Sequence, residues 1–200
     1  MSTTKAASLK ALTATRPTFR AMDAVQAGTP RAILSRLVRE GKLTRLSRGV
    51  YAWVDRVSTE YDSLIEVSVR TPYAVFCLLT ALQFHHLTTQ SPTEVWLALP
   101  NKARIPRIDY PPIHVVRYSG ASLAEGVETH QIQGQTIRVY CVAKTVADCF
   151  KFRNKIGIDI AIEALREAWQ QQKVTMTELY HYGKICRVEK IMRPYLEFLA

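Results

Sequence analysis

Residues 28–53 read GTPRAILSRLVREGKLTRLSRGVYAW, and this stretch decides how the N-terminal part of the chain folds. Thr29 is a good N-cap, and Pro30 suits the first helical position because its missing N–H costs nothing there. Gly41 is expected at the left-handed position that ends a helix. Between these signals the apolar residues recur with helical spacing, and they are Pro30, Ile33, Leu34, Leu37 and Val38. The stretch therefore predicts one helix with a buried face.

The opposite face of this predicted helix is small and cationic. It carries Ala32, Ser35, Arg36 and Arg39, with Arg31 on the flank near the start. A DNA-reading helix needs an anchored rear face, together with hydrogen-bonding groups and room for bases in front. The pattern therefore favours a helix that enters the major groove.

A short hairpin is predicted directly after the helix. Residues 43–46 and 50–53 are rich in strand-favouring side chains, and the segment Ser47-Arg48-Gly49 between them forms the turn. Gly49 is expected to take a positive φ in that turn. Lys42, Arg45 and Arg48 would then lie on a basic wing beside the helix, where they can contact phosphates.

The segments before residue 28 predict the rest of a small helical core. Apolar side chains of the first helix of a helix-turn-helix are expected at Phe19, Ala21, Met22, Ala24 and Val25. Gly28 is placed at the turn, and an earlier amphipathic helix is expected over residues 7–14, with Leu9 and Leu12 inward. These three helices and the hairpin make a winged helix-turn-helix domain over residues 1–57.

Positive charge is concentrated in this predicted domain. Residues 1–57 hold 11 Lys and Arg residues against three acidic ones, whereas the remaining residues hold 16 against 14. The N-terminal net charge is thus +8 of the total of +10. A basic patch on one module is typical of polyanion binding. An ordinary amphipathic helix with a solvated charged face remains the alternative at this stage.

Composition excludes several classes of protein. At 200 residues and 48% hydrophobic content, the chain is long and apolar enough to bury a core. No apolar run approaches the roughly 20 residues that span a bilayer, and the N-terminus lacks the apolar core of a signal peptide. We therefore expect a cytoplasmic protein with no membrane partner. The four cysteines form no C-x-x-C pair, so reduced thiols rather than a metal site are expected.

Residues 58–200 predict a second, mixed α/β domain with a helical C-terminal end, so the whole chain is expected to be α+β. Strands are expected at 93–99, 113–118, 127–132 and 135–141, and helices at 60–70, 73–86, 143–152, 158–169, 175 onward and 190–199. Thr175 and Glu178 have the spacing of a capping box at the start of one of these helices.

Motifs for catalysis are absent from the sequence. There is no P-loop, no G-x-G-x-x-G and no G-x-S-x-G elbow, so no catalytic residue and no cofactor is predicted. Lys144, Asp148 and Lys151 resemble part of a nuclease site, but they also have the ordinary spacing of a helical ion pair. We interpret them as an ion pair and expect a non-enzymatic protein.

The chain resembles the AbiEi-type antitoxins, which are transcriptional regulators of type IV toxin–antitoxin, or abortive-infection, systems. The resemblance lies in the segment quoted above, including its ending RGVY, and in the later segments TALQFHHL, EVWLALP and AKTVADCFKFRNKIGIDIAIEALREA. It implies an N-terminal domain that represses its own promoter by binding inverted repeats, and a C-terminal antitoxin domain. It also implies a nucleotidyltransferase-like toxin as functional partner, without a stable complex between the two proteins.

We therefore predict a DNA-binding repressor and antitoxin whose partner is double-stranded DNA. Base edges are assigned to Ser35, Arg36 and Arg39, with Arg31 at the groove entrance, and phosphates are assigned to Lys42, Arg45 and Arg48. Three alternatives stay open: a nuclease or nucleotide-modifying enzyme targeted by the winged helix, a module whose basic domain binds an acidic protein, and a solitary regulator without a toxin.

Overall fold

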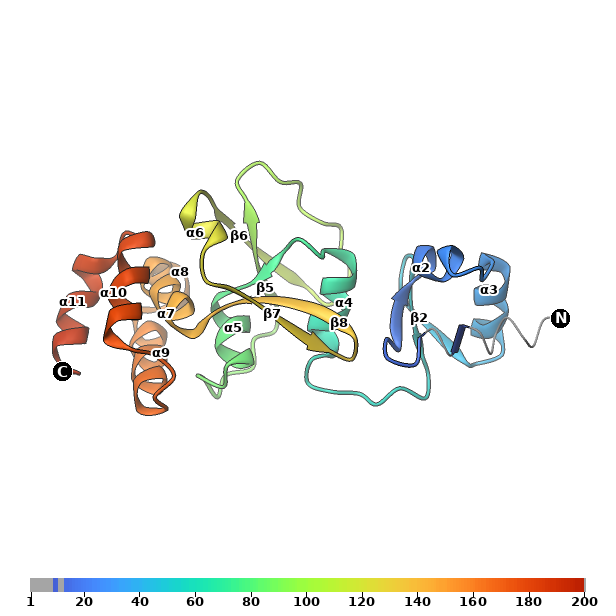
Figure 1. The fold of residues 1–200 in the computed structure, drawn as a ribbon, viewed down its shortest axis with the longest axis horizontal. Helices are drawn as coiled ribbons and strands as arrows, with labels where there is room; N and C mark the ends of the chain where they lie inside the picture. Colours follow the sequence, from blue (N-terminus) through green and yellow to red (C-terminus); the bar gives the residue numbers. More distant parts are fainter. Residues whose placement is uncertain (1–8, 11–12, 200) are drawn as a thin grey trace. The chain divides into compact units, whose positions relative to one another are not determined.

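The computed structural model describes residues 9, 10 and 13–199, and it shows a mixed α+β protein (Figure 1). The chain divides into two compact units. The first contains the chain up to Tyr73 with residues 106–112 and 130–137, and the second contains residues 74–105, 113–129 and 138–200. A domain boundary after residue 57 stays a prediction.

The first unit contains a three-stranded antiparallel sheet, and three helices have bounds within its described residues. The sheet has the order β1-β3-β2, with β1 at Thr18–Arg20, β2 at Leu43–Ser47 and β3 at Val50–Trp53. The helices are α2 at Ala21–Gln26, α3 at Arg31–Arg39 and α4 at Asp62–Arg70. The hairpin and its turn match the prediction, and Gly49 takes a φ of 79°. Strand β1 is missing from the prediction, because three residues carry no periodic signal of their own.

The ends of α3 correct one prediction and confirm another. Pro30, not Thr29, is the N-cap: its ψ of 146° is extended, and no side chain caps the helix. Pro30 therefore cannot occupy the first helical position. At the other end Gly41 has a φ of 69°, as predicted, and donates to Val38 O while Lys42 donates to Leu37 O. These two bonds make a Schellman motif, which satisfies the last carbonyls of the helix.

The core of the first unit is small and apolar. It contains Leu9, Phe19, Ala21, Ala24, Leu34, Leu37, Leu43 and Trp53. Phe19 belongs to strand β1, and from there its side chain enters this core and stacks on Tyr51. The prediction that Phe19 lies on the apolar face of a helix is therefore wrong. Met22 and Val25 are 57% and 42% exposed, because the six-residue α2 turns only its alanines inward. Of the predicted helix at 7–14, residues 7, 8, 11 and 12 lie outside the described residues.

The second unit contains most of a five-stranded mixed sheet with the order β6-β5-β4-β8-β7, whose residues 130–137 are grouped with the first unit. The strands of this sheet are β4 at Val75–Phe76, β5 at Val95–Pro100, β6 at Ile113–Tyr118, β7 at Val127–Ile132 and β8 at Gln135–Tyr140. The predicted helix over 73–86 is wrong in its first half. Residues 75 and 76 pair with β5, and residue 76 pairs with β8 as well. Only then does α5 begin, at Leu78–Phe84. Pairing on both sides outweighs the helical apolar spacing of this stretch.

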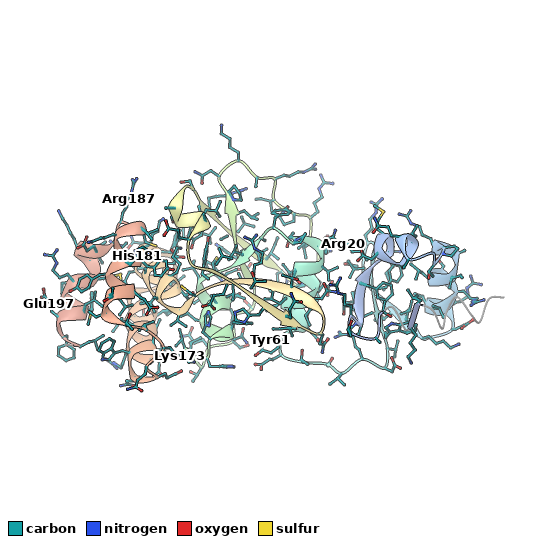
Figure 2. All side chains as sticks on the ribbon, viewed as in Figure 1. Arg20, Tyr61, Lys173, His181, Arg187 and Glu197 are labelled. Atoms are coloured by element: carbon teal, nitrogen blue, oxygen red, sulfur yellow. The ribbon has the colours of Figure 1, made fainter. Side chains whose placement is uncertain are left out.

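Helices gather at one end of the sheet in the second unit (Figure 1). They are α6 at Ala121–Ala124, α7 at Val142–Lys151, α8 at Arg153–Ile156, α9 at Ile158–Gln170, α10 at Met176–Ile185 and α11 at Glu189–Glu197. Helix α7 is central: it packs against α5, α9, α10 and α11. Thr175 and Glu178 form the predicted capping box at α10. Lys173, labelled in Figure 2, donates to His85 O at 2.6 Å and joins the α9–α10 turn to the end of α5.

Candidate nucleic-acid interface

Helix α3 has one buried and one solvent-facing side, because only one side packs against the rest of the first unit. Leu34 and Leu37 are 0% and 2% exposed in the core of the first unit, where α3 packs against α2 and β2. Arg31, Ser35 and Arg39 are exposed on the other side. The Ser35 hydroxyl donates to Arg31 O at 3.3 Å within the helix. The face that was assigned to base edges is therefore available to a large partner.

The β2–β3 hairpin extends this cationic surface. Arg45 is exposed on β2, and Arg48 is exposed in the turn beside Gly49. The register of the two strands shifts between Arg45 and Ser47, so one residue is unpaired just before the turn. Such a bulge increases local twist and redirects the hairpin tip. The seven residues assigned to DNA contact thus lie on α3, on this hairpin and on the short turn between them.

Two of the seven residues are held by a carboxylate. Glu40, the residue after α3, lies 3.3 Å from Arg36 Nε through one oxygen and 2.9 Å from Lys42 Nζ through the other. The hydrogen bond from Lys42, together with the charges of Lys42 and Arg36, holds the pKa of the Glu40 carboxyl below its ordinary value. Arg36 is half-buried, whereas Lys42 is exposed.

Sequence reasoning missed Glu40 as a component of this surface. It entered only as one of three acidic residues that reduce the charge of the N-terminal segment. A signal was present in the four-residue spacing from Arg36, which brings two side chains together on a helix. The second contact, to Lys42, depends on the reversal of the chain at Gly41 and has no comparable signal in the sequence.

The Lys144–Asp148 pair does not form an accessible active site. Lys144 Nζ lies 2.5 Å from Asp148 Oδ2, both side chains are 0% exposed, and the Cys186 thiol donates to Asp148 Oδ1 at 3.2 Å. Lys144 also lies 4.0 Å from the centre of the Tyr140 ring. Burial raises the pKa of Asp148, and Lys144 opposes that rise. The geometry is that of the predicted ion pair, but in the protein core rather than on a surface.

Other groups of residues in the described chain offer no metal centre. No cluster of His, Cys, Asp and Glu among residues 9, 10 and 13–199 has the arrangement of a cation site. The four cysteines are free: Cys77, Cys149 and Cys186 are buried and Cys141 is partly exposed. In the same part of the chain, no helix combines the length and hydrophobicity that crossing a bilayer requires.

Comparison with known proteins finds a family of regulators that matches the segment with the cationic surface. Residues 8–54 match the family model described as "Transcriptional regulator, AbiEi antitoxin". This segment, about a quarter of the chain, is therefore similar to the AbiEi regulators. The matched range ends just after the β2–β3 hairpin, so it contains both α3 and the whole cationic surface. The proteins that this segment resembles are thus described as transcriptional regulators and antitoxins.

The remainder of the chain is related to known structures by fold. The crystal structure of the RV2827C protein from Mycobacterium tuberculosis matches with a TM-score of 0.60 at 15% sequence identity. The match covers 90% of this chain and 71% of that chain, so the shared fold extends well beyond the AbiEi segment. No curated protein matches the chain in sequence.

Proposed function

We propose that the protein is a DNA-binding transcriptional repressor and the autoregulating antitoxin of a type IV toxin–antitoxin system. Residues 1–57 are the winged helix-turn-helix domain in this proposal, and residues 58–200 are the antitoxin-type domain. One observation carries it: the solvent-facing side of α3 and the adjoining hairpin hold the assigned residues within the segment that matches the AbiEi regulators. The protein is a regulator rather than an enzyme in this proposal, and it needs no cofactor.

The seven assigned residues divide into two roles. On α3, Ser35, Arg36 and Arg39 contact base edges in the major groove, because side chains on the outer face of a helix reach that far. Arg31, at the start of α3, lies at the groove entrance. Lys42 and the hairpin residues Arg45 and Arg48 contact phosphates on either side of the groove. The DNA partner is the protein's own promoter, with inverted repeats, and the functional partner is a nucleotidyltransferase-like toxin that forms no stable complex with it.

Fluorescence anisotropy with two labelled duplexes tests the DNA-binding role. One duplex is the region upstream of the protein's own reading frame, and the other is a scrambled duplex of the same composition. Arg36→Ala is expected to lose about 1–3 kcal/mol of discrimination at one base position, whereas Arg48→Ala weakens both duplexes alike and reduces the salt slope by about 1. Equal losses from both variants on both duplexes would contradict this division of roles, and no preference of the wild type would contradict sequence-specific binding.

Co-expression tests the antitoxin role separately. The reading frame next to the gene is expected to encode a nucleotidyltransferase-like protein whose expression alone arrests growth. Co-expression of the full chain is expected to restore growth, and pull-down from the same cells is expected to recover no stable complex. Arrest that persists with a well-expressed antitoxin would contradict the role, while the absence of such a frame would favour a solitary regulator.

A further inference from the structure

The negative charge of Glu40 is stabilised by its two neighbouring cations, Arg36 and Lys42, but it is unfavourable in two other respects. It follows the last turn of α3, where the helix macrodipole is negative and a carboxylate is unfavourable. It also lies within the surface proposed to approach DNA, where a carboxylate repels phosphates. An exposed ion pair contributes little to stability, so the pairs with Arg36 and Lys42 do not by themselves explain the residue.

The carboxylate does distinguish between the two kinds of acceptor that DNA offers to Arg36. A phosphate is an anion, and it must approach Arg36 against the negative charge of Glu40, whose nearest oxygen is 3.3 Å from Arg36 Nε. The base edges of the major groove, such as guanine O6 and N7, are neutral acceptors. They contact a guanidinium without opposing a second negative charge.

We propose that Glu40 is a specificity-determining residue of the DNA-binding surface, because it excludes phosphates from Arg36 while it permits base edges. The 2.9 Å pair with Lys42 holds the carboxylate between α3 and the start of the β2–β3 hairpin in the unbound protein. Glu40 therefore lowers affinity for arbitrary DNA more than affinity for a matched site. This inference rests on the proposed DNA-binding function.

The chain offers a matched control for this residue. Asp55 is also an exposed carboxylate of the first unit, and it lies 2.8 Å from Lys10 Nζ, so its replacement makes the same change in charge and breaks a similar pair. It belongs neither to α3 nor to the β2–β3 hairpin. Glu40→Gln and Asp55→Asn thus differ in where the charge is removed, and not in how much charge is removed.

The test uses the full chain and two duplexes. The first is the tightest duplex that the wild type selects from a random-sequence library, and the second is its scrambled version. Glu40→Gln is expected to raise affinity for the scrambled duplex about three- to tenfold and to leave the selected duplex within about twofold. The salt slope on the scrambled duplex is expected to steepen by about 1, as for one added phosphate contact. Asp55→Asn is expected to change both duplexes by the same small factor.

A double variant tests whether Glu40 acts through Arg36. In an Arg36→Ala background, the gain that Glu40→Gln gives on the scrambled duplex is expected to shrink, because the protected cation is gone. Circular dichroism and thermal unfolding check that each variant folds like the wild type. An undiminished gain in the double variant would overturn the proposed route through Arg36.

The remaining outcomes separate this inference from the function on which it rests. An equal gain on both duplexes would reduce Glu40 to a general charge effect and overturn the proposal. An unchanged preference for the selected duplex would also overturn it. A loss confined to the selected duplex would overturn it too, because Glu40 would then itself accept a hydrogen bond from a base. A library from which the wild type enriches no sequence would contradict sequence-specific DNA binding itself.

Discussion

Replacing Lys144 by Met should destabilise the second unit by an amount that depends on pH. The substitution leaves the Asp148 carboxylate in the core without its cation, since both side chains are 0% exposed and the pair is 2.5 Å apart. At an effective dielectric constant of about 20, two unit charges at this separation attract by roughly 7 kcal/mol. Desolvation of each ion costs several kcal/mol and offsets most of that attraction.

The loss of one partner is therefore much larger than the net contribution of the pair. We expect Lys144→Met to lower the free energy of unfolding by about 3–5 kcal/mol at neutral pH. The double variant Lys144→Met/Asp148→Leu should recover most of this loss, because an apolar pair of similar volume needs no charge compensation. A pair that functioned only in catalysis would give no such recovery of stability.

The pH dependence follows from the pKa of Asp148. Burial already raises this pKa, and the charge of Lys144 opposes the rise, so removing Lys144 raises it further. A carboxyl whose pKa is higher in the folded state binds more protons there, and stability then falls as the pH rises through the folded value. The destabilisation of Lys144→Met is therefore expected to be smaller near pH 5 than near pH 8.

Urea unfolding followed by tryptophan fluorescence measures these differences. A Trp53→Phe background leaves Trp96 and Trp169, both in the second unit, as the only tryptophans of the chain. The proteins with the wild-type pair, the single substitution and the double substitution all carry Trp53→Phe. The effect of Trp53→Phe on the free energy of unfolding therefore cancels in the differences between them. A loss below about 1 kcal/mol, or a loss that grows toward low pH, would refute the assignment of an uncompensated buried charge.

Three further predictions concern single residues. Gly41→Ala should cost about 1–2 kcal/mol, because the φ of 69° is strained for alanine although no atom lies within 4 Å of the added carbon, and thermal unfolding of the first unit measures it. Thr175→Ala should remove the cap of α10 and cost about 1 kcal/mol in urea unfolding, whereas Thr177→Ala, two residues on, should cost less. In titration with a thiol reagent, the native protein should react first at the partly exposed Cys141, and the three buried thiols should react only on unfolding; rapid reaction of all four would contradict their burial.

Much of the local structure could be predicted from the sequence, because its signals are local. The hairpin at 43–53, the left-handed Gly41 and the capping box of Thr175 each depend on residues within a few positions of one another. The concentration of positive charge in the N-terminal segment can also be read directly from the sequence. So can the resemblance of residues 28–53 to the AbiEi antitoxins, with which the match at residues 8–54 agrees.

Only the tertiary structure decided the features that depend on distant partners. Strand β1 exists because it pairs with β3, and residues 75 and 76 are a strand because β5 and β8 flank them. The spacing of Lys144 and Asp148 predicts a pair but not its burial, which requires the strands and helices that surround α7. Periodicity reports which side of a segment is apolar, whereas the partner that covers that side is set by contacts between residues far apart in the chain.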